Sequence, residues 1–417
     1  MGEWKNCTLS SLGTIVGGAT PSTKKPENYE GGEIPWITPK DLSGFSGRYI
    51  SCGERNITEI GLKSCSAQMM PKHSVLFSSR APIGYVAISD CDVCTNQGFK
   101  SIVPNKDTDY LFLYYLLLYK KHEIENLGSG TTFKEVSAST MKGVEVRVPV
   151  DKREQERIAG ILLALDDKIE SNAHINENLE QQAVVLFRSW FSTFSLSPNS
   201  PRVNSEFGEI PEDFAVVKVG SLPMLVTDYV ANGSFASLKA NVNLYQEPNY
   251  AYFIRNTDLK SGTFGVFVDQ HSYEFLSKST LYGGEIIISN VGDVGSVFLC
   301  PKLDGRMTLG NNIIMLRPED AHLRYYLYIW FKYLQGQALI QGIKGGSAQP
   351  KFNKTDFKNT SVLIPPKDIL TRFHEAVAPM FEMISQKQIE TTHLADLRDT
   401  LLPKLMSGEI DVANLDL

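Results

Sequence analysis

The chain has 417 residues, of which 42% are hydrophobic and 21% charged, and its formal net charge is −6. This composition predicts a globular protein of two or three domains, and it excludes a collagen-like chain, a disordered chain and a disulfide scaffold. The first residues lack the apolar core of a secretory signal, and the most apolar run, 111–119, is about half of the roughly 20 residues needed to cross a bilayer. We therefore expect a cytoplasmic protein with no membrane partner.

Five segments follow one another along the chain. We predict a globular domain at 1–150, a long helix at 151–194, a linker at 195–206, a second globular domain at 207–366, and a second long helix with a C-terminal tail at 367–417. The fold class is therefore α+β, with two duplicated α/β domains joined and separated by two long helices that pack as an antiparallel coiled coil.

The two globular segments contain the same series of motifs in the same order, 211–217 residues apart. The matched stretches are 36–42 with 253–259, 77–86 with 288–297, 95–99 with 309–313, and 128–134 with 345–351. The first three pairs join strand-like runs to tight polar turns, and the last pair is a glycine-rich loop. An aromatic-rich helix is predicted at 110–121 and again at 324–334, so one unit is present twice.

Each long helical segment carries an apolar seam in alternating steps of three and four residues. The seam residues are Ile158, Leu162, Leu165, Ile169, Leu179 and Leu186 in the first segment, and Phe373, Val377, Met380, Ile384, Leu394 and Leu401 in the second. Both seams are polar in the middle, at Asn172 and Asn176 and at Lys387 and Thr391, so an antiparallel pair brings the polar middles together. Pro379 is expected to kink or split the second helix, which Pro403 and Gly408 should end.

The sequence contains no persuasive catalytic or metal-binding constellation. It has no phosphate-binding loop, nucleotide-binding glycine motif, nucleophile elbow or zinc-protease motif, and its seven histidines are scattered. Cys91 and Cys94 form a lone CxxC pair, and a zinc site with Cys52 and Cys65 is the alternative to buried free thiols, which we expect. We therefore predict no catalysis, no metal and no cofactor in this chain.

The acidic excess lies mostly in the helical segments: residues 366–417 carry a net charge of −4, whereas residues 1–150 carry +1. A protein that binds DNA alone usually shows a net basic footprint. Charge therefore leaves open whether the globular domains touch nucleic acid, and phosphate neutralisation would come from local clusters or partner subunits.

Several motifs together resemble one known family. They are Ser79-Arg80-Ala81-Pro82-Ile83-Gly84, Thr95-Asn96-Gln97-Gly98, Gly130-Thr131-Thr132-Phe133-Lys134-Glu135-Val136, Glu154-Gln155-Glu156-Arg157-Ile158-Ala159 with Ala164-Leu165-Asp166-Asp167-Lys168-Ile169, and the C-terminal run from Leu397 to Gly408. They are similar to the signature stretches of type I restriction-modification specificity subunits, and they span the chain in the expected order.

The resemblance implies a non-catalytic chain in a multisubunit complex on double-stranded DNA. Each globular domain would be a target recognition domain for half of a bipartite, asymmetric sequence, and the helices would set the half-site spacing. Two modification subunits that use S-adenosylmethionine would methylate adenine, and restriction subunits, which are motors, would use ATP and Mg²⁺ to cleave DNA. All these cofactors are expected on the partners.

The candidate DNA contacts are polar residues in the matched turns, where donors suit base edges and phosphates. They are Thr38, Lys40, Ser79, Arg80, Asn96, Gln97, Thr131 and Lys134 in the first domain, and Arg255, Asn256, Ser289, Asn290, Asn311, Asn312, Gln349 and Lys351 in the second. The second repeat departs from the first where Gly292-Asp293 replaces Ala81-Pro82 and Asn311-Asn312 replaces Gln97-Gly98. The competing interpretation is that these residues cap turns.

Two other functions stay open at this point. The chain could be a DNA-binding or scaffolding subunit of another methyltransferase or defence assembly. It could also be an enzyme of unrecognised type whose two duplicated domains enclose a site, although the missing acid–base or metal constellation speaks against this.

Overall fold

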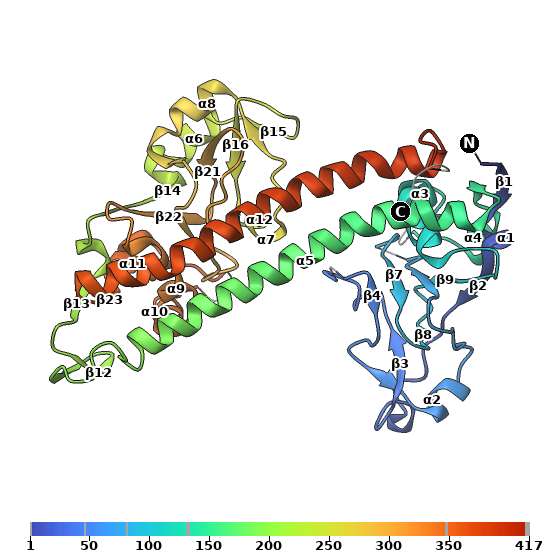
Figure 1. Ribbon diagram of the computed structural model, residues 1–417, viewed down its shortest axis with the longest axis horizontal. Helices are drawn as coiled ribbons and strands as arrows, with labels where there is room; N and C mark the ends of the chain where they lie inside the picture. Colours follow the sequence, from blue (N-terminus) through green and yellow to red (C-terminus); the bar gives the residue numbers. More distant parts are fainter. Residues whose placement is uncertain (1, 46, 81, 131–133, 347–348, 413–417) are drawn as a thin grey trace. The chain divides into compact units, whose positions relative to one another are not determined.

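Figure 1 shows the computed structural model, which describes residues 2–45, 47–80, 82–130, 134–346 and 349–412. The chain divides into two units: unit 1 consists of Met1–Ser171 and Thr391–Leu417, and unit 2 of Asn172–Glu390. Both long helices contribute to both units, because each is divided between them. None of the helices in the described ranges has the length and apolar character needed to span a membrane.

Unit 1 is built on a five-stranded sheet in the order β2-β9-β6-β7-β4. A smaller sheet has the order β5-β3-β8, in which β3 and β8 are parallel, and β1 pairs with β10. The strands are β1 Trp4–Thr8, β2 Gly13–Gly17, β3 Ile34–Ile37, β4 Tyr49–Ile50, β5 Asn56–Ile57, β6 Val75–Phe77, β7 Val86–Ser89, β8 Cys94–Thr95, β9 Lys100–Pro104 and β10 Glu145–Pro149. The helices are α1 Leu9–Leu12, the short 3-10 helix η1 Pro26–Asn28, α2 Glu59–Lys63, α3 Tyr110–Asn126 and α4 Ala138–Gly143.

Unit 2 contains a four-stranded sheet, β14-β22-β19-β20, and a five-stranded sheet, β15-β17-β16-β21-β18. The strands are β11 Arg202–Ser205, β12 Gly208–Pro211, β13 Ala215–Lys218, β14 Met224–Asp228, β15 Leu244–Tyr245, β16 Ala251–Ile254, β17 Phe267–Val268, β18 Thr280–Leu281, β19 Ile286–Ser289, β20 Val297–Leu299, β21 Arg306–Leu309, β22 Ile313–Pro318 and β23 Ser361–Ile364. The helices are α6 Phe235–Asn241, α7 Asn256–Ser261, α8 Gln270–Phe275, α9 Leu323–Lys332, α10 Leu334–Gly342 and α11 Lys354–Lys358, with the 3-10 helices η2 Val219–Ser221, η3 Tyr229–Asn232 and η4 Ser277–Ser279.

The sheet topology confirms the internal duplication. The strand order β2-β9-β6-β7 in unit 1 has its counterpart in β14-β22-β19-β20 of unit 2, and the parallel pair β3-β8 in β16-β21. The pair β1-β10 likewise matches β13-β23. Apart from the insertions that unit 2 carries, the two units therefore share one fold.

The central strand of each main sheet is buried on both faces, which explains its continuous apolar sequence. In β6, Val75 and Phe77 belong to the core beneath α3, whereas Leu76 points to the opposite core. In β19, Ile286 and Ile288 belong to one core and Ile287 to another. This alternation follows from the two-residue period of a strand. The aromatic helices α3 and α9, which the sequence predicts, cover equivalent faces.

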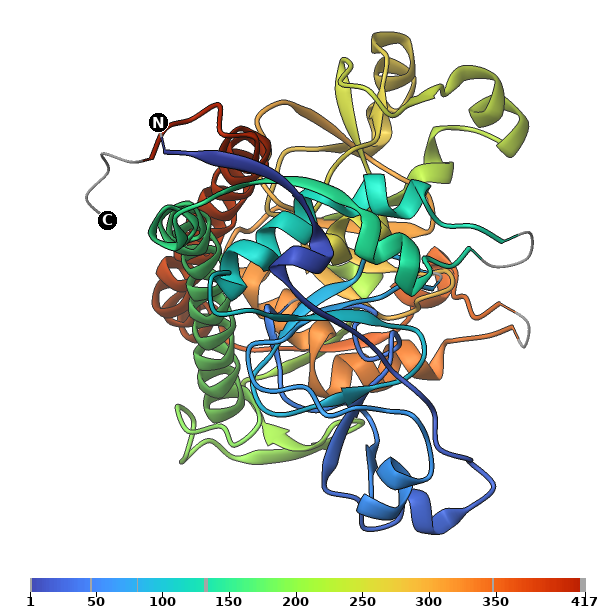
Figure 2. The ribbon, with the colours of Figure 1, turned by 90° about the vertical axis from the view of Figure 1, so that its right-hand side faces the viewer.

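The long helices α5, Lys152–Phe191, and α12, Lys367–Ser407, pack side by side (Figures 1 and 2). Their direction can be read within each unit. In unit 1, Ile158 of α5 shares a core with Leu405 of α12. In unit 2, the ring of Phe187 lies 5.8 Å from that of Phe373. The N-terminal part of α5 thus meets the C-terminal part of α12 and the reverse, which confirms the predicted antiparallel pairing.

The seam residues are buried to different degrees. Ile158, Leu162, Phe373 and Val377 are buried, whereas Leu165, Ile169, Leu179, Leu186, Met380, Ile384, Leu394 and Leu401 are half-buried. The polar middle is present in unit 2, where Asn172 is fully buried and its side-chain amide donates to Glu390 at 3.1 Å.

The expected split at Pro379 and the expected end at Pro403 in α12 are both wrong. The helix is continuous from Lys367 to Ser407, so Pro379 does not split it and Pro403 does not end it. Pro379 is exposed, while the neighbouring residues Val377 and Phe381 pack into the core of unit 2. This packing holds the helix on both sides of the lost hydrogen bond. Gly408 does end the helix, with φ of 76°.

Candidate nucleic-acid interface

Four loops that are distant in sequence meet in unit 1. They follow β3 (38–41), β6 (78–85, of which 78–80 and 82–85 are described), β8 (96–98) and α3 (128–136, of which 128–130 and 134–136 are described). The Asn96 amide donates to the Ile37 carbonyl at 3.0 Å, and the Ser79 amide to Gly98 at 2.7 Å. The Val136 amide donates to Ser79 at 2.9 Å, so the β6 loop joins the β8 loop to the α3 loop.

Unit 2 joins its four corresponding loops with equivalent hydrogen bonds. The Gly310 amide donates to Ile254 at 2.8 Å, the Asn290 amide to Asn312 at 3.1 Å, and the Phe352 amide to Asn290 at 3.0 Å. The turn motifs that repeat along the sequence are therefore brought together in both units, on backbone frames of the same register.

The hydrogen bonds correct one detail of the sequence alignment. Glu135 pairs with Ser129 and bridges Arg80, and Lys351 pairs in the same way with Gly345 and bridges Val291. Lys351 is thus the structural counterpart of Glu135, and not of Lys134 as the motif alignment predicts. The motif is too short and variable to align the two copies residue by residue, whereas the backbone pairing on either side of the loop fixes which residues correspond.

The candidate residues of unit 1 differ in how available their side chains are. The hydroxyl of Thr38 donates to Asp41 at 2.6 Å, and the side chain of Asn96 accepts from the Gly98 amide at 2.9 Å, so both stabilise turns. Gln97 is exposed and accepts a hydrogen bond from Thr20. Lys40 is exposed and forms an ion pair with Glu54 at 2.6 Å, which raises the pKa of Lys40.

Among the remaining candidates of unit 1, Lys134 is exposed, Arg80 is 45% exposed, and Thr131 lies outside the described residues. Two of the candidate residues, Ser79 in unit 1 and Ser289 in unit 2, are fully buried. Their hydroxyls lie inside the loop junctions and do not reach the surface, so neither can contact DNA in this conformation. We leave both serines out of the proposed contacts.

In unit 2, Arg255 binds Asp258 side-on, with Nε and Nη2 donating over 2.6–3.2 Å. The side-chain nitrogen Nδ2 of Asn256 lies 3.4 Å from Asp293. The side-chain nitrogen Nδ2 of Asn290 donates to the Phe352 carbonyl at 3.3 Å. The exposed candidates are Asn311, Asn312, Gln349 and Lys351. Asn312 has φ of 65°, a left-handed conformation that Asn tolerates better than most residues.

The structure adds charged residues that the motif comparison misses. Glu135 and Lys100 form ion pairs beside Arg80 in unit 1. In unit 2, Asp293 binds Lys260 at 2.7 Å, Ser296 at 2.6 Å and Asn256, and the contact with Lys260 lowers the pKa of Asp293. The position next to the glycine-rich loop carries Glu135 in the first copy of the motif and Lys351 in the second. Comparing the charges of the two copies there could have drawn attention to Glu135.

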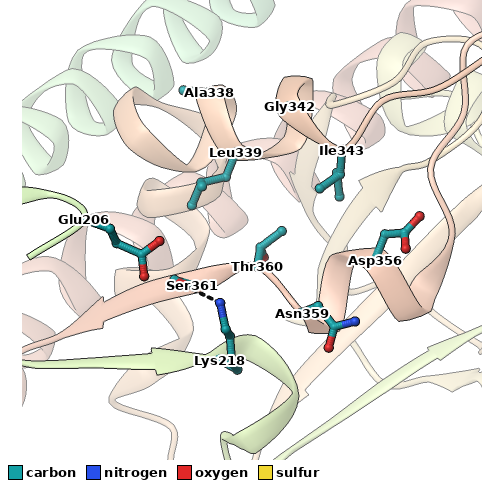
Figure 3. A pocket seen from close by; sticks show the side chains of 10 residues that line it. All are labelled: Glu206, Lys218, Ala338, Leu339, Gly342, Ile343, Asp356, Asn359, Thr360 and Ser361. Atoms are coloured by element: carbon teal, nitrogen blue, oxygen red, sulfur yellow. Dashed lines mark hydrogen bonds between the residues drawn. The ribbon is translucent and has the colours of Figure 1, made fainter.

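Unit 2 also contains a shallow hollow of about 440 Å³ away from these loops (Figure 3). Its wall includes Leu339 from α10 and Ile343 from the region that follows it, with Glu206 and Asp356 at opposite sides. The ammonium group of Lys218 donates to Ser361 at 2.8 Å. The described lining residues carry one lysine and two acidic side chains, so they offer no net positive charge to an anionic ligand.

The six cysteines are free thiols. Burial raises the pKa of Cys94 to about 12, and its thiol donates to the Pro35 carbonyl. Within the described ranges, no three His, Cys, Asp or Glu side chains are grouped as metal ligands.

The family model of the type I restriction modification DNA specificity domain matches residues 1–181 and 211–393. The chain belongs to this family. The two matched stretches cover both repeats together with most of the long helices.

Individual relatives agree with this assignment. The type I restriction enzyme MjaIX specificity subunit of Methanocaldococcus jannaschii is 36% identical over 99% of this chain and 95% of its own length. The HindI specificity subunit of Haemophilus influenzae is 23% identical over 98% of this chain and its entire length. A type I restriction-modification S subunit from M. genitalium has the same fold, with a TM-score of 0.56 and 18% identity, over 97% of this chain and 96% of that one.

Proposed function

We propose that each unit of this specificity subunit reads one half of a bipartite, asymmetric DNA sequence. The observation that carries this proposal is the pair of loop junctions, which share a backbone frame but differ in side chains. At matching places unit 1 has Arg80 and Glu135, whereas unit 2 has Val291 and Lys351. Two readers with different side chains select different half-sites, whereas identical domains on a two-fold frame read a palindrome.

The paired helices are proposed to set the distance between the half-sites. At about 1.5 Å per residue, the 40 residues of α5 form a rod of about 60 Å. This exceeds the roughly 34 Å between half-sites that are one helical turn apart. A stiff connection raises the effective concentration of the second reader once the first is bound.

The chemistry is proposed to belong to partner subunits. Two modification subunits with S-adenosylmethionine would dock on the helices and methylate adenine, and restriction subunits with ATP and Mg²⁺ would cleave DNA. This chain would contribute sequence selection and assembly, without catalysis or a cofactor of its own.

The deciding experiment is to express this chain with the modification subunit encoded beside it in a methylation-free host, and to map methylated adenines by single-molecule sequencing. We expect a bipartite motif with a fixed gap that disappears when this chain is omitted. A stable complex that leaves the host DNA unmethylated would overturn the reading function and favour a scaffold.

A further inference from the structure

Arg80 lies in a paired part of the unit 1 junction. Its backbone forms an antiparallel bridge with Glu135, and the hydrogen bonds of the neighbouring residues Ser79 and Val136 hold the same register. Arg80 nevertheless remains accessible, since its side chain is 45% exposed. An arginine on a fixed backbone loses less conformational entropy when it binds than one on a loose loop.

Glu135 holds the guanidinium group of Arg80 at its inner nitrogen. Nε of Arg80 lies 3.0 Å from Oε2 of Glu135, and Oε1 of Glu135 lies 3.6 Å from Nζ of Lys100. The side chain of Lys100 is only 12% exposed, so this lysine anchors Glu135 from inside the domain. No terminal nitrogen of Arg80 donates to another described residue, which leaves the outer edge of its fork available.

The other candidate arginine lacks this arrangement. Arg255 uses both Nε and Nη2 to bind Asp258, which is only 5% exposed, so its fork is engaged within unit 2. At the places of Arg80 and Glu135, unit 2 has Val291 and Lys351. At the loop junction, the held arginine therefore occurs in unit 1, and the matching place in unit 2 lacks it.

We propose that Arg80 reads a guanine in the half-site of unit 1, and that Glu135 is the positioning residue that aims its fork. The terminal nitrogens of arginine match the O6 and N7 acceptors of guanine in the major groove, which is the commonest specific contact between protein and DNA. An ion pair behind the guanidinium fixes its plane before DNA arrives. Unit 2 cannot present the same fork at this place, because the side chain of Val291 has no hydrogen-bond donor. This inference rests on the proposed reading function and adds the base and the residues.

The test uses the assembled methyltransferase complex and the motif found by methylation mapping. Each guanine of the two half-sites is replaced in turn by 7-deazaguanine, which lacks the N7 acceptor, and affinity is measured for the wild type and for Arg80→Ala. Replacing one particular guanine, in one half-site, should weaken DNA binding by the wild type. The same replacement should not weaken DNA binding by Arg80→Ala any further. We expect Arg80→Ala itself to reduce discrimination at that base pair by roughly 5- to 150-fold.

Arg80→Lys separates base reading from simple charge. It should retain the salt dependence of binding but weaken the preference for guanine, since lysine presents a point charge in place of a fork. The matched control Val291→Ala, at the equivalent place in unit 2, should leave this guanine preference unchanged. If Arg80→Ala weakens all sequences equally and lowers the salt slope by about one, then Arg80 contacts a phosphate and the assignment is wrong.

The positioning role of Glu135 is tested separately, by measuring discrimination at the same guanine. Glu135→Gln should reduce discrimination at the same guanine, and the double variant Arg80→Ala/Glu135→Gln should discriminate no worse than Arg80→Ala, because both act through one contact. Additive losses would contradict the positioning role. Absence of any methylation motif dependent on this chain would refute the reading function itself, whereas an intact motif insensitive to Arg80→Ala would refute only this inference.

Discussion

Arg398 of α12 and Asp166 of α5 form an ion pair with 2.9 Å between Nη1 and Oδ1, in the part of the helix pair that belongs to unit 1. Asp166 also accepts a hydrogen bond from the hydroxyl of Tyr115 in α3 at 2.7 Å and lies 3.9 Å from Arg48. One carboxylate therefore connects both long helices to the globular part of unit 1.

Asp166→Asn should destabilise unit 1 by about 1–3 kcal/mol, because it leaves charged partners in partly buried positions without their counter-charge. The matched control is Asp399→Asn: Asp399 binds the same Arg398 at 2.8 Å but is 65% exposed. Removing such a surface partner should cost at most about 1 kcal/mol. Urea unfolding followed by circular dichroism measures both, and equal effects would contradict the central role of Asp166.

Substitution of a buried aromatic residue between the long helices of unit 2 should destabilise the fold more than substitution at a surface position of these helices. Phe373 is fully buried and contacts the rings of Phe187 and Phe191 at 5.8 Å and 5.0 Å. Phe373→Ala should lower the free energy of unfolding by about 3–5 kcal/mol through lost burial and a cavity. Val185→Ala, at a position 65% exposed on α5, should change it by less than about 0.5 kcal/mol. A small effect at Phe373 would mean that the helix pair repacks.

The junction of α9 and α12 should lose stability in mild acid. Burial, His322 and Arg324 lower the pKa of His374 below 6.5, against the opposite effects of Asp320 and Glu382. Because the folded state prefers neutral His374, its contribution is fully present above pH 6.5 and is lost as the pH falls through the lowered pKa. The melting temperature of the wild type should therefore approach that of His374→Gln between pH 7.5 and 5.5. A difference that stays constant across this range would show that His374 does not titrate differently on folding.

Lengthening both helices should lengthen the DNA spacer. Inserting one heptad between Ser171 and Asn172 and another between Glu390 and Thr391 preserves the pairing inside each unit, because these are the points where the units divide. Each insertion adds roughly 10 Å, equivalent to about three base pairs. Methylation mapping should show unchanged half-sites separated by a longer gap. Seven residues added to the loop at 197–201 are the control and should leave the gap as it was; an unchanged gap in the helix variant would refute the ruler model.

The sequence by itself determined the duplication, the two long helices and their antiparallel direction. These features depend on periodic patterns: apolar steps of three and four place one stripe on a helix, and polar residues such as Asn172 are tolerated only where another polar group meets them. The family assignment likewise rests on motifs that can be recognised in the sequence without knowledge of the structure.

Tertiary structure decided which polar side chains of the loops are available. Ser79 is buried, Arg255 is engaged by Asp258, and Arg80 is held by Glu135 with its outer edge exposed. In the sequence motifs these residues look equally able to donate hydrogen bonds to DNA. Their partners within the protein come from other loops or depend on local geometry, so the sequence does not show which donors are already engaged. Likewise, the continuous helix through Pro379 is maintained by the packing of Val377 and Phe381 in the core of unit 2. Local propensity predicts a break there, but burial of large side chains outweighs the loss of one backbone hydrogen bond.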